Sequence, residues 1–196
     1  MAKLNKHQYA GQLRIIGGKW RGRKLNFPDV EGLRPTPDRV RETLFNWLQD
    51  KIGNARCLDL FAGSGAFGFE AASRGAESVT MVESDPVASK QLQSHCQLLT
   101  AANCNVESKT AQQFLISSLQ QFDIVFIDPP YKSNLWSEIA AQLMTHAVLA
   151  DNAYIYLECP TKDELPILPA QWHIIKDKKA GGVRYCLFTH NLGDTV

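Results

Sequence analysis

The sequence has few cysteines and no long apolar run, and these shortages exclude several classes of protein. The five cysteines among 196 residues form no CxxC pair and show no zinc-site spacing, which fits a reduced cytosolic protein. No uncharged apolar stretch approaches the roughly 20 residues of a membrane span. The N-terminus has lysines but no apolar segment of a secretory signal. We therefore expect a globular cytoplasmic protein with no membrane partner, long enough to bury a substantial core.

Charge is distributed unevenly along the chain, although the net charge is only +1. Residues 1–41 hold ten lysines and arginines against three acids, whereas residues 42–196 hold eleven against seventeen. A basic segment on a mildly acidic body predicts a polyanionic partner that is contacted chiefly through that segment. A merely solvated terminus is the alternative that charge alone leaves open.

The basic segment is predicted to form a two-stranded ribbon over residues 12–27, because apolar residues flank the pair Gly17-Gly18. Basic side chains surround Trp20, and this composition suits contact with a nucleic-acid backbone and an occasional stacked base. In the alternative interpretation the hairpin is solvated and Trp20 packs on the body. The ribbon residues that we predict to contact RNA are Lys19, Arg21, Arg23 and Lys24.

A helix is predicted to follow the ribbon, with Thr36 as its N-cap and Pro37 as its first residue. Apolar side chains then recur on one helical face, which predicts that this face packs in the core. Arg39 and Arg41 point away from that face, so we expect both to contact phosphate.

From residue 56 onwards, predicted strands and helices alternate. Strands are predicted at 56–61, 78–83, 104–108, 122–128 and 153–159, helices at 66–74, 86–101, 110–119 and 135–149, and a closing hairpin at 171–178 and 183–190. Such alternation is typical of a parallel sheet with helices on both faces. The hairpin adds one antiparallel strand. The sequence thus predicts an α/β fold with a seven-stranded, mostly parallel sheet and an N-terminal β-ribbon extension.

A glycine-rich turn follows the first of these strands. Gly63 and Gly65 lack a Cβ, so the backbone can turn sharply and a ligand can lie against it. About 20 residues further on, the next strand ends in Glu83, whose carboxylate can accept both hydroxyls of a ribose. Together these features predict a nucleoside cofactor lying across the strand ends.

The strand at 122–128 runs into the tetrapeptide Asp128-Pro129-Pro130-Tyr131. Two consecutive prolines fix two φ angles and remove two donors, so this loop is predicted to be rigid. Asp128 and the Pro129 carbonyl can each accept an N–H of a nucleobase amine and stabilise the positive charge that grows on its nitrogen. Tyr131 offers a stacking face worth about 1–3 kcal/mol to an unstacked base. A local turn with Asp128 as a cap is the structural alternative.

Three acids, Asp59, Glu83 and Asp128, are predicted at strand ends and should therefore converge at one edge of the sheet. The motifs DLFAGSG at 59–65 and DPPY at 128–131 resemble class I S-adenosylmethionine-dependent methyltransferases that modify nucleobase amino groups. The segments RIIGGKWRGRKL and RPTPDRVRETLF make the chain similar to the bacterial RsmD family, which methylates guanine N2 in 16S ribosomal RNA. The resemblance covers residues 12–190.

The resemblance implies a Rossmann-like class I methyltransferase fold, S-adenosyl-L-methionine as cofactor, no metal, and 16S rRNA within a small-subunit (30S) particle as partner. It further implies that residues 1–53 contact RNA and close over the cofactor, and that residues 54–196 form the catalytic domain. The five histidines are dispersed, in keeping with a site without metal. No apolar helix stripe is left over for a second copy, so we expect a monomer.

Site residues are carried over from the family by position. Asp59 and the turn after it would hold the methionine moiety, Glu83 the ribose and Ser84 and Ala111 the adenine. The cofactor residues so implied are Arg34, Thr36, Asp59, Phe61, Ala62, Gly63, Ser64, Gly65, Glu83, Ser84 and Ala111. The residues implied to hold the flipped guanine are Asp128, Pro129 and Tyr131. Further RNA contacts are expected from Lys178, Lys179 and Arg184.

Three other functions stay open on the residues alone. The glycines also fit the dinucleotide motif of a nicotinamide-dependent dehydrogenase, although that motif is weak by itself. A similar DPPY loop occurs in adenine-N6 DNA methyltransferases and in protein-glutamine methyltransferases. The third alternative is a non-enzymatic RNA-binding assembly factor that keeps a cofactor fold.

Overall fold

The computed structural model describes residues 9–28, 36–162 and 164–191. The helices are α1 (Asp38–Trp47), α2 (Ala66–Ser73), α3 (Pro86–Leu99), α4 (Ala111–Ser117) and α5 (Trp136–Thr145). The strands are β1 (Tyr9–Arg14), β2 (Lys24–Pro28), β3 (Arg56–Asp59), β4 (Ser78–Val82), β5 (Cys104–Glu107), β6 (Phe122–Ile127), β7 (Leu149–Pro160), β8 (Trp172–Ala180) and β9 (Val183–His190). The predicted order of strands and helices is confirmed.

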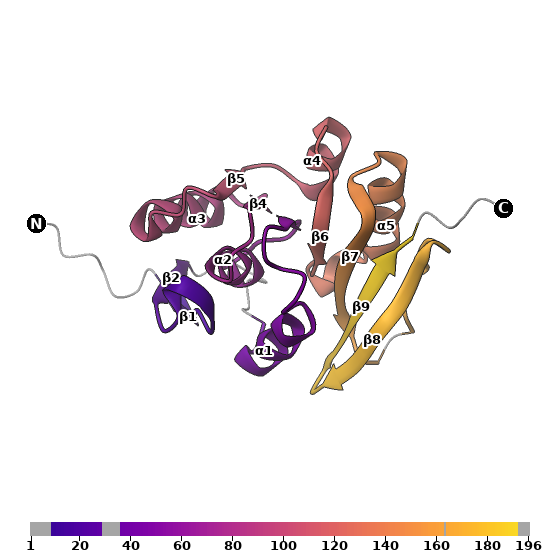
Figure 1. The fold of residues 1–196 in the computed structure, drawn as a ribbon, viewed down its shortest axis with the longest axis horizontal. Helices are drawn as coiled ribbons and strands as arrows, with labels where there is room; N and C mark the ends of the chain where they lie inside the picture. The colour runs from indigo at the N-terminus through magenta and orange to yellow at the C-terminus, as the bar shows by residue number, and fades with distance from the viewer. Residues whose placement is uncertain (1–8, 29–35, 163, 192–196) are drawn as a thin grey trace, which may run out of the picture.

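A single seven-stranded sheet organises the main body, in the order β5-β4-β3-β6-β7-β9-β8 (Figure 1). The pairs from β5 to β7 are all parallel, and β9 runs antiparallel to both of its neighbours. The chain leaves β3 towards β4 on one side and later returns to β6 on the other. This reversal creates a topological switch point, where α/β sheets bind ligands beyond the carboxyl ends of their strands.

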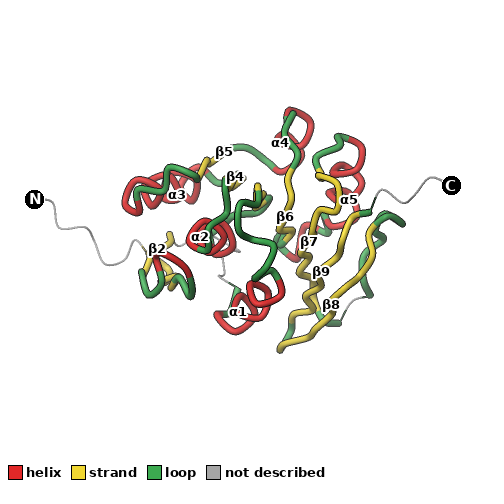
Figure 2. The backbone as a smooth tube through the Cα atoms, in the orientation of Figure 1, coloured by secondary structure: helices red, strands yellow, loops and turns green. Residues whose placement is uncertain are grey.

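Helices cover both faces of the sheet (Figure 2). One apolar cluster combines residues of α1, α2 and α3 with side chains such as Cys57, Met81 and Phe126. A second cluster joins α4 and α5 to the opposite face through side chains such as Leu58 and Val125. Adjacent residues of β3 thus enter opposite clusters, as the twofold alternation of a strand requires. In the described part of the chain, no helix combines the length and apolar character needed to cross a membrane.

The N-terminal ribbon β1–β2 packs beside α2 and α3, at the end of the molecule opposite β8 (Figure 1). Its inward side chains Leu13, Ile15 and Trp20 belong to the same apolar cluster as α2. Trp20 is 8% exposed, and its backbone N–H donates to Ser73 Oγ at 2.9 Å. Base stacking by Trp20 is therefore a wrong expectation, because packing on the body buries the ring. The ribbon and the main body share one core, while the functional division at residue 53 stays a prediction.

Among the described glycines, Gly18 would place an added Cβ closest to a neighbouring atom, because the ribbon packs tightly on the body there. It has a φ of +74°, and a Cβ built there would lie 1.8 Å from the Ser73 carbonyl oxygen. Gly22 has a φ of +84° but nothing within 4 Å of such a Cβ. Gly22→Ala should therefore cost only the backbone strain of about 1–2 kcal/mol. Gly18→Ala should cost about 1–3 kcal/mol more, because the overpacked contact adds to that strain. Urea unfolding of both variants measures the difference, and equal costs would contradict the described docking.

Candidate active site

The switch point brings together the ends of β3, β4 and β6. Asp59 is the last residue of β3, Glu83 directly follows β4, and Asp128 directly follows β6. Asp59 lies opposite Met81 on one side and Phe126 on the other, so these three strand ends are neighbours in the sheet. The predicted convergence of three acids at one edge is confirmed.

The glycine-rich turn is fastened to the end of β4. Gly63 N–H donates to Glu83 Oε2 at 2.8 Å, and the other oxygen of that carboxylate accepts the Asp85 N–H at 2.7 Å. Gly63 and Gly65 have φ values of +50° and +79°, which favour glycine at both positions. Gly65 N–H donates to the Ala62 carbonyl at 2.7 Å and closes the turn before α2 begins. The turn thus presents its backbone next to a carboxylate.

Asp59 lies beneath this turn and is 1% exposed. Its Oδ2 accepts the Gly68 N–H at 3.0 Å, which holds the first turn of α2 against β3. Burial raises the pKa of Asp59 to about 7, against the hydrogen bond from Gly68, and the charge of Glu83 adds to the increase. Asp59 therefore changes its charge near neutral pH.

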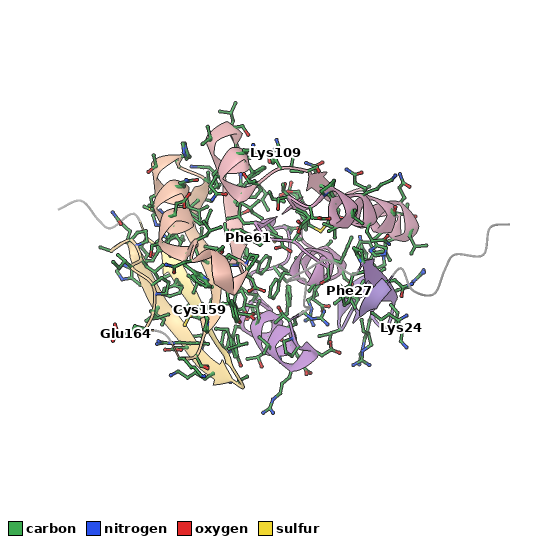
Figure 3. All side chains as sticks on the ribbon, turned by 180° about the vertical axis from the view of Figure 1, so that it is seen from behind. Lys24, Phe27, Phe61, Lys109, Cys159 and Glu164 are labelled. Carbon is green, nitrogen blue, oxygen red and sulfur yellow. The ribbon has the colours of Figure 1, made fainter. Side chains whose placement is uncertain are left out.

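The other predicted cofactor residues occupy different depths around the turn. Phe61 and Gly63 are partly exposed, Ser84 is exposed, and Ala62, Ser64, Gly65 and Ala111 are buried. Phe61 lies near the centre of the molecule in Figure 3, whereas Lys24 and Phe27 lie on the ribbon at one side. Ala111 is the first residue of α4, next to a capping box between Thr110 and Gln113. Arg34 lies outside the described residues.

The loop after β6 places a carboxylate, a buried proline and an aromatic ring in succession. Pro129 is buried, whereas Tyr131 is 43% exposed and lies 6.1 Å from the Trp136 ring, centroid to centroid. Limited solvation raises the pKa of Asp128 well above its usual value, and the charges of Glu158 and Asp59 act in the same direction. The loop is therefore accessible on the tyrosine side and poorly solvated at the carboxylate.

Thr36 reaches this loop instead of capping a helix. Its Oγ1 donates to Asp128 Oδ2 at 3.4 Å, and the side chain is buried. Helix α1 begins at Asp38, with Pro37 at the N-cap and no side-chain cap bond. The N-cap prediction for Thr36 is wrong, because the extended backbone at Pro37 directs the preceding hydroxyl towards the strand ends.

Glu158 is a site residue that sequence reasoning missed. It lies in β7, the strand paired with β6, and is 4% exposed. Its carboxylate accepts the Tyr156 hydroxyl at 2.8 Å and the Tyr131 hydroxyl at 3.4 Å. Burial raises its pKa, and the bonds from Tyr156, Tyr131 and Thr36 oppose the increase. The signal in the sequence is an acid that directly follows the apolar run 153–157, at the end of the strand predicted after the DPPY loop.

The basic residues predicted to contact RNA fall into two exposed sets and two exceptions. Lys19, Arg21, Arg23 and Lys24 are exposed on the ribbon, and Arg39, Lys178 and Lys179 are exposed on α1 and β8. Figure 1 shows α1 between the ribbon and the β8–β9 hairpin. Lys178 Nζ lies 5.8 Å from the ring centroid of Trp47, at the end of α1. Arg184 is half-buried and forms a bidentate pair with Asp177 at 2.6 and 3.1 Å.

Arg41 is the second exception, and its prediction as a phosphate contact is wrong. Its side chain is 1% exposed. Nη2 binds Asp38 Oδ1 at 2.6 Å and donates to the Arg14 carbonyl at 3.0 Å, while Nε donates to the Thr36 carbonyl at 3.3 Å. Nη1 lies 3.7 Å from Glu70 Oε2. Arg41 therefore joins α1, the ribbon and Thr36 internally.

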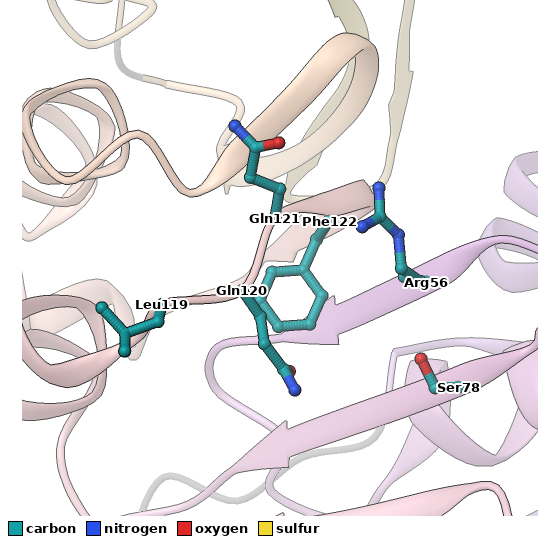
Figure 4. A pocket seen from close by; sticks show the side chains of 6 residues that line it. All are labelled: Arg56, Ser78, Leu119, Gln120, Gln121 and Phe122. Carbon is teal, nitrogen blue, oxygen red and sulfur yellow. The ribbon is translucent and has the colours of Figure 1, made fainter.

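A pocket lies at the opposite edge of the sheet, near the starts of β3, β4 and β6 (Figure 4). Its lining residues are Arg56, Ser78, Leu119, Gln120, Gln121 and Phe122. None of the predicted site residues that the structure describes contributes to it. Among the residues that the structure describes, no three His, Cys, Asp or Glu side chains are grouped so that they could hold a metal ion.

Comparison with known proteins places these features in one family. The family model "Conserved hypothetical protein 95" matches residues 13–189. Ribosomal RNA small subunit methyltransferase D of Escherichia coli (strain K12) is 49% identical over 188 residues, covering 96% of this chain and 94% of that protein. The Haemophilus influenzae protein of the same name is 44% identical, covering 96% and 99% of the two chains.

Solved structures agree with this assignment. The Escherichia coli protein yhhF superposes with a TM-score of 0.87 at 46% identity, over 92% of this chain and 99% of that one. SMU.776, solved in complex with SAH, shares the fold at 14% identity and a TM-score of 0.72, over 96% of this chain and 57% of that one. The expected Rossmann-like class I methyltransferase fold is confirmed. The chain belongs to the family of ribosomal RNA small subunit methyltransferase D.

Proposed function

We propose that this protein transfers a methyl group from S-adenosyl-L-methionine to the exocyclic N2 of a guanine in 16S rRNA. The observation that carries the proposal is that the Asp128–Tyr131 loop lies next to the glycine-rich turn. The loop follows β6 and the turn follows β3, the two neighbouring strands at the switch point. The names of the relatives support small-subunit rRNA as the substrate. The half-exposed ring of Tyr131 beside Asp128 supports a nucleobase amine as the acceptor.

The chemistry of the residues around the turn fits the proposed cofactor. S-Adenosylmethionine carries positive charge on its sulfur and its amino group, together with two ribose hydroxyls. Asp59 provides a carboxylate near the turn, and Glu83 provides a carboxylate whose oxygens already hold the backbone of the turn. Asp59 and the backbone from Phe61 to Gly65 would hold the methionine part, and Glu83 the ribose. When bound, the cofactor supplies the activated methyl group.

The DPPY loop would act on the acceptor amine by orientation and electrostatics. The lone pair of a guanine amine is delocalised into the ring, so the amine is a poor nucleophile. Asp128 and the Pro129 carbonyl would each accept one N–H, direct the nitrogen and stabilise its growing positive charge. Tyr131 would stack on the base once it has left its helix. No covalent intermediate on the protein is required.

The N-terminal segment and the β8–β9 hairpin would contact the RNA together. Exposed cations lie on the ribbon, on α1 and on β8, and α1 connects the two ends (Figure 1). The family resemblance implies Thr36 as a cofactor residue, and its hydroxyl bonds Asp128 on the acceptor side, so we place Thr36 where cofactor and acceptor would meet. We further propose that the enzyme acts as a monomer in the cytoplasm on a 30S particle.

Nucleoside analysis tests the proposed function directly. Small subunits from a strain lacking the gene are incubated with purified enzyme and S-adenosylmethionine, and the digested 16S rRNA is analysed by mass spectrometry. We expect one new N2-methylguanosine, located by fragment mapping, and free 16S rRNA serves as the comparison substrate. N6-methyladenosine, or no modified nucleoside, would contradict the proposal. If equilibrium measurements show binding of NAD and no binding of S-adenosylmethionine, the alternative of a nicotinamide-dependent dehydrogenase is favoured.

Cofactor affinity should depend on pH through Asp59. Its pKa is raised to about 7 by burial, so the group is protonated below that pH. A cationic ligand favours the ionised form, and binding at lower pH must therefore release a proton. We expect affinity to be roughly ten-fold weaker at pH 6 than at pH 8, and level above the pKa. Calorimetry at pH 6 in buffers of different ionisation enthalpy should report the released proton. A flat profile from pH 6 to 8 would exclude this role.

RNA affinity should depend on salt through the ribbon. Each neutralised phosphate contributes about 0.7 to 0.9 to the slope of log affinity against log salt concentration. Changing Lys19, Arg21, Arg23 and Lys24 to alanine should therefore reduce the slope by about 3 to 3.6 if all four contact phosphate. Filter binding of 16S rRNA at several salt concentrations measures it, with exposed Lys90→Ala on α3 as control. An unchanged slope would show that the ribbon does not contact the phosphate backbone of the RNA.

A further inference from the structure

Glu158 lies beside the DPPY loop, yet the proposed transfer gives it no role. It belongs to β7, the strand next to β6, and shares the Thr36 hydroxyl with Asp128. The Tyr131 hydroxyl points at its carboxylate. A carboxylate that is 4% exposed is costly to desolvate, so its presence beside a second acid calls for a ligand or a structural purpose.

The two oxygens of Glu158 are held unequally. Oε2 accepts the Tyr156 hydroxyl at 2.8 Å, an ordinary distance for an O–H···O bond. Oε1 is 3.4 Å from the Tyr131 hydroxyl, beyond the usual range. Asp128 Oδ2 is likewise 3.4 Å from the Thr36 hydroxyl. Each acid therefore keeps one weakly engaged oxygen, and Tyr156 fixes the Glu158 carboxylate in place.

The two neighbouring acids, Asp128 and Glu158, match the Watson–Crick edge of guanine better than that of adenine. Guanine carries two adjacent donors on its Watson–Crick edge, the N1–H and the N2 amine, whereas adenine has an acceptor at N1. Asp128 is assigned to the N2 amine under the proposed function. A second carboxylate next to it would accept the neighbouring N1–H and repel the N1 lone pair of adenine.

We propose that Glu158 is a specificity-determining residue that accepts a hydrogen bond from N1–H of the target guanine, with Tyr156 holding its carboxylate in position. This inference rests on the proposed function, since it requires a guanine at the DPPY loop. The Tyr131 ring then stacks on the base, and its hydroxyl remains near the same carboxylate.

The first test changes the substrate and leaves the protein intact. Small subunits are reconstituted with 16S rRNA carrying 2-aminopurine at the mapped target position. 2-Aminopurine keeps the N2 amine but presents an acceptor at N1. We expect single-turnover methylation by the wild-type enzyme to be about 100-fold slower than with guanine, since an unpaired buried polar group strongly penalises the wrong base. Equal rates would overturn the proposal.

The second test locates the discrimination at Glu158. In Glu158→Gln the amide can turn either its oxygen or its nitrogen to N1, so the ratio of guanine to 2-aminopurine rates should fall below about ten-fold. Glu164→Gln, an exposed acid after β7, is the matched control and should keep the wild-type ratio. A wild-type ratio in Glu158→Gln would overturn the proposal. If Glu158→Gln has a much lower melting temperature than the wild type, Glu158→Asp takes its place. The shorter side chain moves the carboxylate away from N1, so the rate ratio should again fall below about ten-fold.

Failure of this inference can be distinguished from failure of the proposed function. If wild-type enzyme produces N2-methylguanosine but Glu158→Gln keeps the wild-type ratio of guanine to 2-aminopurine rates, only the proposed role of Glu158 is wrong. If wild-type enzyme produces no N2-methylguanosine on the guanine substrate, the proposed function itself is wrong. S-Adenosylmethionine affinity of Glu158→Gln should stay within about three-fold of wild type, because a base-reading residue does not contact the cofactor.

Discussion

Asp128→Ala is expected to reduce the single-turnover rate of methyl transfer by about 100- to 1,000-fold, the loss typical of one preorganised electrostatic group. Asp128 would accept an N–H of the reacting amine and face the positive charge that grows there. Alanine removes both contributions, and the Pro129 carbonyl remains as the only acceptor assigned to the amine. Quench-flow measurements at saturating cofactor report the chemical step itself.

Cofactor binding separates this role from a general disturbance of the site. S-Adenosylmethionine affinity of Asp128→Ala should remain close to that of the wild type, because Asp59 and the glycine-rich turn do not hydrogen-bond Asp128 in the structure. Asp123→Asn is the control, since Asp123 lies near the other end of β6 and pairs with Arg56. Lost cofactor affinity in Asp128→Ala, measured by calorimetry, would contradict the assigned role.

Glu70→Ala is expected to destabilise the protein by about 3–5 kcal/mol, the cost of removing one partner from a buried ionic network. Glu70 is fully buried in α2 and accepts the Ile16 and Gly17 N–H groups at 2.8 Å each. Arg74 Nε donates to it at 2.7 Å, and Arg41 Nη1 lies 3.7 Å away. Alanine would leave the Arg41 charge without this partner in the core and remove two of the hydrogen bonds that hold the ribbon on α2.

An exposed ion pair provides the comparison. Arg56 and Asp123 pair at 2.9 Å with both side chains more than one-third exposed. Arg56→Ala should therefore cost no more than about 1 kcal/mol. Urea unfolding of both variants measures the contrast, and a melting temperature lowered by roughly 6–20 °C in Glu70→Ala would agree with it. Similar costs for the two variants would show that the buried network contributes little.

Local patterns in the sequence were sufficient for the fold and for the position of the site. Apolar runs such as residues 124–127 are long enough to identify a central strand, and β–α alternation then restricts the topology. Because the carboxyl ends of parallel strands share one edge, Asp59 and Asp128 could be placed together from their positions alone. Glycine at 63 and 65 indicated the turn, since few other residues tolerate its φ angles.

The rest depended on contacts between distant segments. Arg41 looks like a surface cation on its own helix, but the ribbon and Glu70 of α2 enclose it. Trp20 is buried for the same reason. Thr36 fits a helix cap by sequence, and only the fold shows that its hydroxyl faces Asp128. Glu158 is an acid in β7, and the sequence does not show that this part of the strand is buried on both faces. Its burial beside the DPPY loop therefore could not be predicted.

The ribbon is synthesised before the surface on which it packs. Trp20 N–H bonds to Ser73, 53 residues later in the chain. While a ribosome is still producing α2, the side chains of Leu13, Ile15 and Trp20 have no partner cluster to enter. Contacts of such sequence separation form slowly because the intervening loop must first close. The apolar side chains of the nascent N-terminal segment therefore remain exposed to solvent until translation has passed α2. During this period chaperones can bind the segment, or it can associate with other chains.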